Sequence, residues 1–203
     1  MLQTQTVSPE LLELLKLLMT VPEISELRLV GGTSLALQMG HRISIDIDLF
    51  GKTELNELEI TALLKNFGTA TILSKSKNIL IYTVNEVKID FVNYSYNWID
   101  EEIIIDNVRL ASKKDIAAMK LNAIAGRGSK KDFIDLHFLL KEFSLKQMMT
   151  FYLAKYPEGS DFLVLKSLSY FEDADKEITP KILVPCDWNE IKTGIASEVS
   201  KYL

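Results

Sequence analysis

Residues 43–49 alternate between aliphatic and polar side chains more regularly than any other part of the chain. The aliphatic positions are Ile43, Ile45, Ile47 and Leu49. A period of two is typical of a half-buried β-strand, so Asp46 and Asp48 leave the same polar face. Two neighbouring carboxylates repel each other, and a magnesium ion, which prefers one or two carboxylates plus phosphate oxygens, would relieve that repulsion. Solvated strand surface is the alternative interpretation of the pair.

A second alternating stretch, residues 87–92, places another acid, Asp90, on the polar face of a strand. If this strand lies beside residues 44–50, the carboxylates of Asp46, Asp48 and Asp90 converge. Two metal ions about 3.5–4 Å apart would then activate an attacking hydroxyl and neutralise a leaving pyrophosphate. Taken alone, Asp90 fits solvated surface better than a metal site.

A Gly-Gly-Thr-Ser sequence at residues 31–34 separates a strand predicted over residues 27–30 from a short helix that Gly40 stops. Thr33 or Ser34 is expected to cap this helix. Glycines let phosphate oxygens approach the backbone, and a helix N-terminus offers free N–H groups and the positive end of the dipole. The sequence is neither a P-loop nor a dinucleotide fingerprint. It predicts phosphate binding because the Asp-x-Asp strand follows it.

The first half of the chain mixes strands with helices. Helices are predicted from Pro9, capped by Ser8, and over residues 53–64. Further strands are predicted at residues 70–73, 79–84 and 87–92, with Asn85-Glu86 as a hairpin turn and one more strand or a sheet edge at residues 103–110. The expected fold class is therefore α+β, with a head over residues 1–111 and a helical region over residues 112–203.

Helix signals dominate the region after Lys113. Ser129 with Asp132 and Asp187 with Glu190 have the spacing of capping boxes. Basic residues gather between positions 113 and 131, opposed within that stretch only by Asp115; they are Lys113, Lys114, Lys120, Arg127, Lys130 and Lys131. The cluster is either a local anion site or a solvated helix face.

Composition limits the setting in which this chain works. The net charge of −5 argues against a surface built for non-specific nucleic-acid binding. A lone cysteine, Cys186, suits a reducing compartment. The N-terminus has no signal-peptide pattern, and no apolar run is long enough to span a membrane. We therefore expect a cytoplasmic protein without a membrane partner.

Two segments carry a resemblance to a known family. Residues 31–35 (GGTSL) and 42–50 (RISIDIDLF) resemble the first motif of DNA-polymerase-β-like nucleotidyltransferases, and more narrowly the AbiEii/AbiGii-type toxins of abortive-infection and type IV toxin–antitoxin systems. Residues 115–120 (DIAAMK) and 127–136 (RGSKKDFIDL) are similar to the second half of the same family.

The resemblance implies a mixed-sheet head, magnesium dependence with two ions, and transfer of a nucleotide from an NTP to an acceptor. It implies that the 3′ end of tRNA is the acceptor and that a cognate antitoxin is a partner. Asp46, Asp48 and Asp90 would hold metal. The nucleotide would meet Gly31, Gly32, Thr33, Ser34, Arg42, Ser44, Lys120, Lys131 and Asp135, and the helical region would complete the site, with Lys120 and Asp132 as further catalytic residues.

Two other functions stay open. A regulatory module could keep this fold and bind a nucleotide or a partner without chemistry. A nucleotidyltransferase could instead modify a small molecule such as an aminoglycoside, which the acidic net charge favours, whereas the basic cluster favours RNA.

Overall fold

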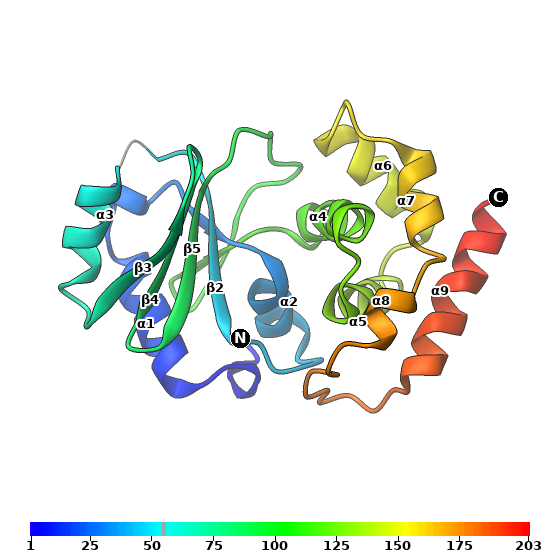
Figure 1. Ribbon diagram of the computed structural model, residues 1–203, viewed down its shortest axis with the longest axis horizontal. Helices are drawn as coiled ribbons and strands as arrows, with labels where there is room; N and C mark the ends of the chain where they lie inside the picture. The colour runs from blue at the N-terminus through cyan, green and yellow to red at the C-terminus, as the bar shows by residue number, and fades with distance from the viewer. Residues whose placement is uncertain (54–55) are drawn as a thin grey trace. The chain divides into compact units, whose positions relative to one another are not determined.

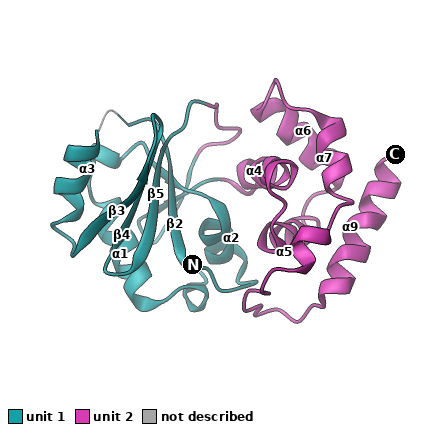
Figure 2. Cartoon of the chain, in the orientation of Figure 1, with its two compact units in different colours: residues 1–95, 102–111 teal, residues 96–101, 112–203 magenta. Residues whose placement is uncertain are grey.

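The computed structural model describes residues 1–53 and 56–203, and these form two compact units (Figure 2). The first unit comprises residues 1–95 and 102–111, and the second comprises residues 96–101 and 112–203. The change from strands to helices falls at Ala111 and Ser112. No helix in the described ranges is long and apolar enough to cross a membrane.

The first unit is built on a seven-stranded mixed sheet (Figure 1) in the order β3-β4-β5-β2-β1-β7-β6. Its strands are β1 (Arg28–Leu29), β2 (Asp46–Gly51), β3 (Ala70–Lys75), β4 (Ile79–Val84), β5 (Val87–Asn93), β6 (Ile103–Ile105) and β7 (Val108–Leu110). Its helices are η1 (Thr4–Thr6), α1 (Pro9–Met19), η2 (Pro22–Ile24), α2 (Gly31–Met39) and α3 (Glu57–Leu64).

One face of this sheet packs onto α1 and α3, and Leu37 of α2, which lies beside β2 (Figure 1), belongs to the same buried core. The buried face carries the alternate residues Ile47 and Leu49 of β2 and Ile89 and Phe91 of β5. Burying aliphatic and aromatic side chains removes apolar area from water, at roughly 25 cal/mol per Å². Because strand side chains alternate, this burial sends the intervening residues of β2 and β5 to the opposite face.

Several predicted elements of the first unit are confirmed. Ser8 caps α1 by accepting a hydrogen bond from the Leu11 backbone N–H at 3.2 Å. The predicted hairpin turn joins β4 and β5, with positive φ at both Asn85 (47°) and Glu86 (71°), as a type I′ turn requires. Gly40 ends α2 in the left-handed conformation. The expected α+β class with a mixed sheet and a helical C-terminal region is confirmed.

Four local predictions in this unit need correction. The helix after Gly31 begins at Gly31 itself with Val30 as its N-cap, so neither Thr33 nor Ser34 caps it. The strand predicted from Ile43 begins only at Asp46, because Ser44 is buried and Ile45 is 72% exposed, which reverses the expected alternation. The helix predicted from residue 53 begins at Glu57; residues 54–55 lie outside the described part. Residues 103–110 form two strands joined by a turn with positive φ at residues 106 and 107.

The second unit is helical. Its helices are α4 (Lys113–Gly126), α5 (Lys130–Leu139), α6 (Leu145–Lys155), α7 (Asp161–Ser167), α8 (Glu172–Asp175) and α9 (Trp188–Tyr202). Helix α4 contacts α5, α6 and α7, and α9 packs on α5 and α6. The capping box at Asp187 and Glu190 is confirmed. The one predicted at Ser129 is wrong, because the Ser129 hydroxyl donates instead to the Asp132 carboxylate at 2.7 Å.

Candidate active site

The register between β2 and β5 brings the predicted acids onto neighbouring positions. The two strands are parallel and adjacent, with Asp48 opposite Asp90 and Asp46 opposite Lys88. All three acids belong to the half-buried set that alternates with the fully buried residues of both strands. The condition on which the three-carboxylate prediction depended, adjacency of the two strands, is therefore met in the structure.

A lysine that the sequence reasoning passed over lies among these acids. The Lys88 ammonium is 2.6 Å from Asp90 Oδ1, and the two side chains are 37% and 19% exposed. Burial opposes the charge of Lys88, but Asp90, and more weakly Asp46 and Asp48, outweigh that effect and raise its pKa. Its position two residues before Asp90 on an alternating strand was the signal that could have identified it.

The chemistry of this donor set fits a divalent metal ion. Asp90 Oδ1 is buried and makes no well-aligned hydrogen bond to any described residue, although the Lys88 ammonium lies close to it. Carboxylate oxygens are the protein ligands that Mg²⁺ prefers. Within residues 1–53 and 56–203, no three His, Cys, Asp or Glu side chains are already arranged around a common metal position. Asp46, Asp48 and Asp90 are thus adjacent donors, with a lysine ammonium in place beside one of them.

The N-terminus of α2 lies against the same carboxylates. Gly31 has φ of 68°, and a Cβ placed on it would be 2.5 Å from Asp48 Oδ2. The first intrahelical hydrogen bond of α2 runs from the Ser34 N–H to the Val30 carbonyl at 3.3 Å. The amides of residues 31–33 therefore precede the helical hydrogen-bond ladder, as first-turn N–H groups do. Such a terminus, next to an Asp-x-Asp strand, is suited to phosphate.

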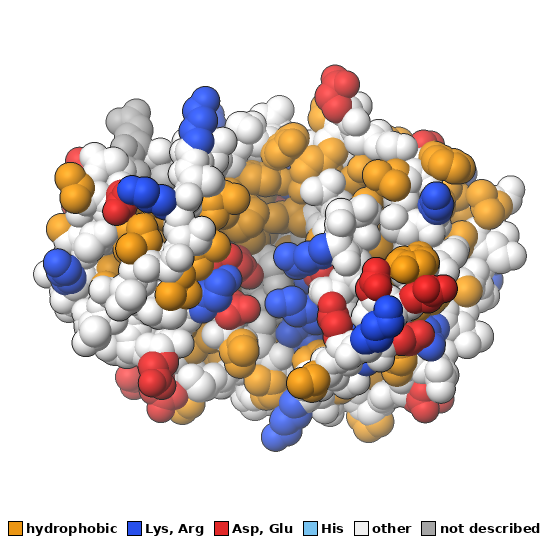
Figure 3. Space-filling model, viewed as in Figure 1, with side chains coloured by type: hydrophobic (Ala, Val, Ile, Leu, Met, Phe, Trp, Pro, Cys, Tyr) orange, Lys and Arg blue, Asp and Glu red, His pale blue; other side chains and the backbone are white. Residues whose placement is uncertain are grey.

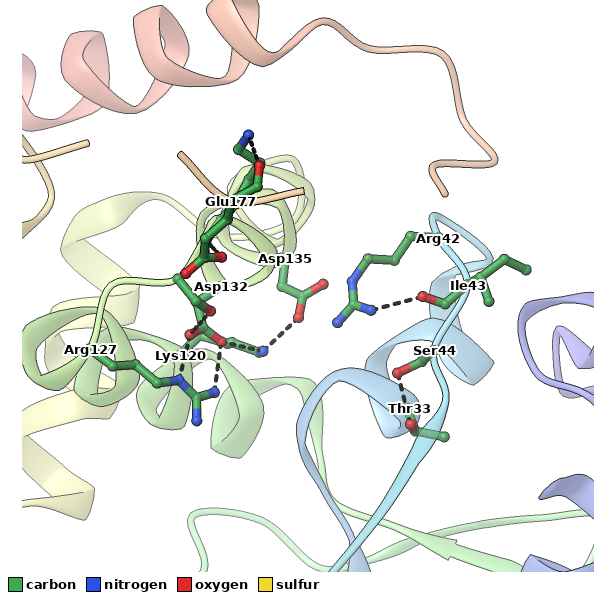
Figure 4. Close-up of polar contacts among 11 residues, drawn as sticks. Thr33, Arg42, Ile43, Ser44, Lys120, Arg127, Asp132, Asp135 and Glu177 are labelled. Carbon is green, nitrogen blue, oxygen red and sulfur yellow. Dashed lines mark hydrogen bonds and ion pairs between the residues drawn. The ribbon is translucent and has the colours of Figure 1, made fainter. Parts of the chain in front are cut away.

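Within the first unit, the polar side chains that were predicted to bind the nucleotide are largely buried and form hydrogen bonds to other residues of that unit (Figure 4). The Thr33 hydroxyl lies 2.8 Å from the Ser44 hydroxyl and donates to the Asp46 carbonyl, which links α2 to the start of β2. The Ser34 hydroxyl accepts from the Gln38 amide at 3.2 Å. Arg42, 3% exposed, donates to the Ile43 carbonyl at 2.9 Å.

Arg42 also lies against the helix start. A Cβ on Gly32 would overlap Arg42 Nη2, so the second glycine makes room for the guanidinium. The two glycines thus have different functions: Gly31 allows the left-handed backbone beside Asp48, and Gly32 allows the approach of Arg42. In this arrangement, the backbone of α2 rather than the Thr33 and Ser34 hydroxyls is available to phosphate.

We expect alanine at Gly31 to destabilise the first unit by about 1–2 kcal/mol, because alanine pays for a positive φ and its Cβ would collide with Asp48. Alanine at Gly126, where a Cβ meets nothing within 4 Å, should instead stabilise α4 by about 0.5–1 kcal/mol. Urea unfolding followed by far-UV circular dichroism compares the two variants. Equal effects would contradict the steric role of Gly31.

A second group of predicted residues forms a buried ion-pair cluster in the helical unit (Figure 4). The Lys120 ammonium is 2.8 Å from Asp132 Oδ1 and 2.6 Å from Asp135 Oδ2. Arg127 Nε is 2.9 Å from Asp132 Oδ2. Both carboxylates are fully buried, and Lys120 is 4% exposed. Two cations and two carboxylates balance each other here, which makes the burial of these charges tolerable.

The contacts of Asp132 define what it does within this cluster. Its two oxygens accept from Lys120, twice from Arg127 and from the Ser129 hydroxyl. Burial by itself would raise the pKa of Asp132, but the charges of Lys120 and Arg127 outweigh it and hold that pKa far below the usual range. With four accepted hydrogen bonds, Asp132 is an anchor that orients Lys120 and Arg127.

The lowered pKa of Asp132 predicts a pH dependence of stability. A carboxylate whose pKa is lower in the folded state contributes stability above its unfolded pKa of about 3.9, and that contribution is lost as the pH falls. We expect Asp132→Asn to reduce the loss of unfolding free energy between pH 7 and pH 3 by about 1 kcal/mol relative to wild type. Both tryptophans, Trp98 and Trp188, lie in the helical unit, so their fluorescence reports its urea unfolding. Identical pH profiles would contradict this role.

Most of the basic residues between positions 113 and 131 have partners outside that stretch. Lys113 pairs with Glu142 at 2.5 Å, Lys114 with Asp100 at 3.1 Å, and the Lys130 ammonium donates to backbone carbonyls including that of Glu177. Lys131 is exposed. Acidic side chains also lie beside basic ones over the helical unit on the face shown in Figure 3. The basic residues of this stretch are thus largely compensated by acids that lie beyond its ends.

Sequence reasoning also missed a fully buried ion pair in the helical unit. Lys155 lies 2.7 Å from Asp115 Oδ1, and neither side chain is exposed. Asp115 accepts the backbone N–H of Ile99 at 2.9 Å, and Lys155 donates to the Asn97 carbonyl at 3.0 Å. The pair therefore holds residues 96–101 against the ends of α4 and α6. Forty residues separate its members, so no local pattern indicated it.

The chain resembles known proteins in both sequence and structure. The chain is 35% identical over 181 residues to the uncharacterized protein aq_aa25 of Aquifex aeolicus, covering 86% of this chain and 87% of that one. In structure it resembles JHP933 from Helicobacter pylori, with a TM-score of 0.57, 19% identity and coverage of 95% of this chain and 88% of that one. It also resembles the antibiotic-resistance factor ANT(2″)-Ia, with a TM-score of 0.53, 14% identity and coverage of 73% and 94%.

The structural likenesses show a shared fold, that of polymerase-β-like nucleotidyltransferases, and the sequence match is narrower. The family model described as nucleotidyl transferase AbiEii toxin, type IV TA system, matches residues 13–199. This range includes both the strand pair that carries the acids and the Lys120 cluster. The chain is a nucleotidyltransferase and belongs to the AbiEii toxin family.

Proposed function

We propose that this enzyme transfers a nucleoside monophosphate from an NTP to a hydroxyl group of RNA, with the 3′ end of tRNA as the acceptor. The observation that carries the proposal is the pairing of Asp48 with Asp90 across β2 and β5, beside Asp46 and the N-terminus of α2. Adjacent carboxylates next to free backbone N–H groups suit a metal-bound triphosphate.

The acids would hold two magnesium ions, and Asp90 is either the third ligand or the general base. Bound there, magnesium would supply Lewis-acid activation and neutralise charge on the triphosphate. The first-turn amides of residues 31–33 would bind phosphate oxygens. The acceptor hydroxyl attacks the α-phosphorus, the bond between the α-phosphorus and the bridging oxygen breaks, and pyrophosphate leaves.

In the helical unit, Lys120 would contact the nucleotide or its phosphates. Asp132 and Asp135 hold its ammonium at 2.8 Å and 2.6 Å, so its position is fixed before any ligand binds. Pre-organised charge stabilises a transition state without reorganisation during the reaction. Lys131 is exposed on the first turn of α5 and supplies a further cation for the nucleotide or RNA.

Family membership supports a biological setting for this chemistry. The family description names a toxin of a type IV toxin–antitoxin system. We therefore propose that the protein acts in the cytoplasm, that its tRNA modification stops translation as in abortive infection, and that a cognate antitoxin protein opposes it.

A small-molecule acceptor is the second candidate. The fold is shared with ANT(2″)-Ia, an antibiotic-resistance factor, and the net charge of −5 suits a cationic acceptor such as an aminoglycoside better than RNA. The basic residues that would have favoured RNA are largely paired with acids inside the helical unit.

The acceptor is tested by incubating the enzyme with each α-³²P-labelled NTP, Mg²⁺ and either intact or periodate-oxidised tRNA, followed by a denaturing gel. Label on intact tRNA that is absent after periodate treatment, which destroys the 3′-terminal diol, supports the proposal. Label on both RNAs would move the modification away from the 3′ end. Label that appears only when an aminoglycoside replaces tRNA supports the second candidate.

A further inference from the structure

Lys88 occupies a position that places a positive charge inside the carboxylate face of the first unit. The four cross-strand positions Asp46, Lys88, Asp48 and Asp90 form two neighbouring pairs on β2 and β5. Together they hold three carboxylates and one ammonium. A lysine here reduces the local charge from −3 to −2, in the same place where the proposed function requires metal ions.

The contact between Lys88 and Asp90 is close, yet it leaves an oxygen of Asp90 incompletely satisfied. The ammonium lies 2.6 Å from Asp90 Oδ1, but its direction does not make a well-aligned hydrogen bond, and no other described residue donates to that atom. Buried carboxylate oxygens normally have donors. The nearby ammonium therefore neutralises the charge of this oxygen without a well-aligned hydrogen bond. The lone pairs of the oxygen stay available to a cation that approaches from another direction.

The Lys88 side chain can also move away from this position. Its side chain is 37% exposed, and a lysine ammonium is a compact charge on a flexible four-carbon stem. Ion pairs that remain accessible to solvent are weak. By contrast, the side chain of Lys120 is 6% exposed, and its ammonium is held by two buried carboxylates. Among the described residues, Lys88 thus has the exposure and the single ion-pair partner expected of a displaceable cation, whereas Lys120 has the burial and the two partners expected of a fixed one.

We propose that Lys88 is a displaceable counter-ion that compensates the three carboxylates when metal is absent and must release Asp90 when metal binds. The inference rests on the proposed metal site of the nucleotidyl transfer reaction. A divalent ion and the Lys88 ammonium compete for the same oxygen, so Lys88 lowers the affinity for metal alone. It also limits the repulsion among the acids in the empty enzyme. Lys88 is in this sense a positioning residue, which acts through Asp90.

The test is the affinity of the purified full-length protein for Mn²⁺ without nucleotide, measured from the electron paramagnetic resonance signal of free Mn²⁺. Lys88→Met should bind Mn²⁺ roughly fivefold more tightly than wild type, since a competing ion pair and a repelling charge are removed. Lys88→Arg retains the charge and should bind no more tightly than wild type. Lys75→Met is the matched control. Lys75, on strand β3, forms a similar ion pair at 2.7 Å with Glu57, on helix α3.

The outcomes separate this inference from the proposed function. Tighter binding by Lys88→Met alone supports the counter-ion role, whether or not transfer is observed. Equal or weaker binding by Lys88→Met, with binding abolished in Asp48→Asn, would overturn the role of Lys88 and leave the metal site in place. Equal binding by wild type, Lys88→Met and Asp48→Asn would overturn the metal site, and the inference with it.

Discussion

Asp48→Asn should lower nucleotide transfer by about 10³-fold or more, because it removes charge from the centre of the carboxylate face. Asp48 pairs with Asp90 on β5 and approaches the backbone of Gly31, so it connects the acids to the α2 terminus. The amide has nearly the same shape as the carboxylate. Transfer is measured as incorporation of α-³²P-labelled NMP into acceptor, with the fold checked by circular dichroism.

The matched control for this variant is Asp173→Asn. Asp173 lies on α8 in the helical unit, its side chain is 65% exposed, and its ion pair with Lys176 is 3.6 Å long. The same loss of one negative charge at this site should leave transfer within about twofold, because exposed pairs contribute little. Full activity of Asp48→Asn, with the fold intact, would contradict the assignment of the active site.

Lys155→Met should destabilise the helical unit by about 3–5 kcal/mol, because it leaves the Asp115 carboxylate buried without its cation. Neither side chain of the pair is exposed to solvent, and their charged atoms are 2.7 Å apart. Lys155 also lies 4.4 Å from the ring centre of Trp98, so the native fluorescence should change as well. Urea unfolding followed by tryptophan fluorescence measures the loss.

Two further variants define the cause of that loss. Lys176→Met removes an exposed lysine from the same unit and should change stability by less than about 0.5 kcal/mol. The double variant Lys155→Met, Asp115→Asn removes both charges, while the amide oxygen can still accept the Ile99 N–H. It should recover part of the lost stability. A double variant less stable than Lys155→Met would show that the charge of Asp115 is not the main cause.

The strands that carry the acids were predictable because their burial follows local sequence. In β5, Ile89 and Phe91 are buried and Asp90 lies between them, as the alternation predicted. The turn at Asn85 and Glu86 fixes the hairpin register, so the place of β5 beside β4 also followed from short-range signals. Pairing of β5 with β2 is a long-range contact. No local pattern predicts it, so the convergence of the three acids could be predicted only on the condition that these two strands are neighbours.

Other features depended on partners that no short window contains. Ser44 is buried because its hydroxyl meets Thr33 of α2, so the alternation that holds for Asp46 and Ile47 fails just before them. Ser129 and Asp132 have capping-box spacing, but Lys120 and Arg127 bind the same carboxylate. The ion pairs of Asp132 depend on the tertiary structure, and they replace the local capping box that the sequence spacing predicts.

The most direct test of the central claim compares α-³²P-labelled with γ-³²P-labelled NTP under identical conditions, with Mg²⁺ and total tRNA. Nucleotidyl transfer moves the α-phosphorus to the acceptor and releases the γ-phosphorus in pyrophosphate. The predicted result is α-label on RNA, no γ-label on RNA, and loss of the α-label with Asp46→Ala. Transfer of γ-label, or α-label that persists in Asp46→Ala, would contradict nucleotidyl transfer at the Asp46, Asp48 and Asp90 site.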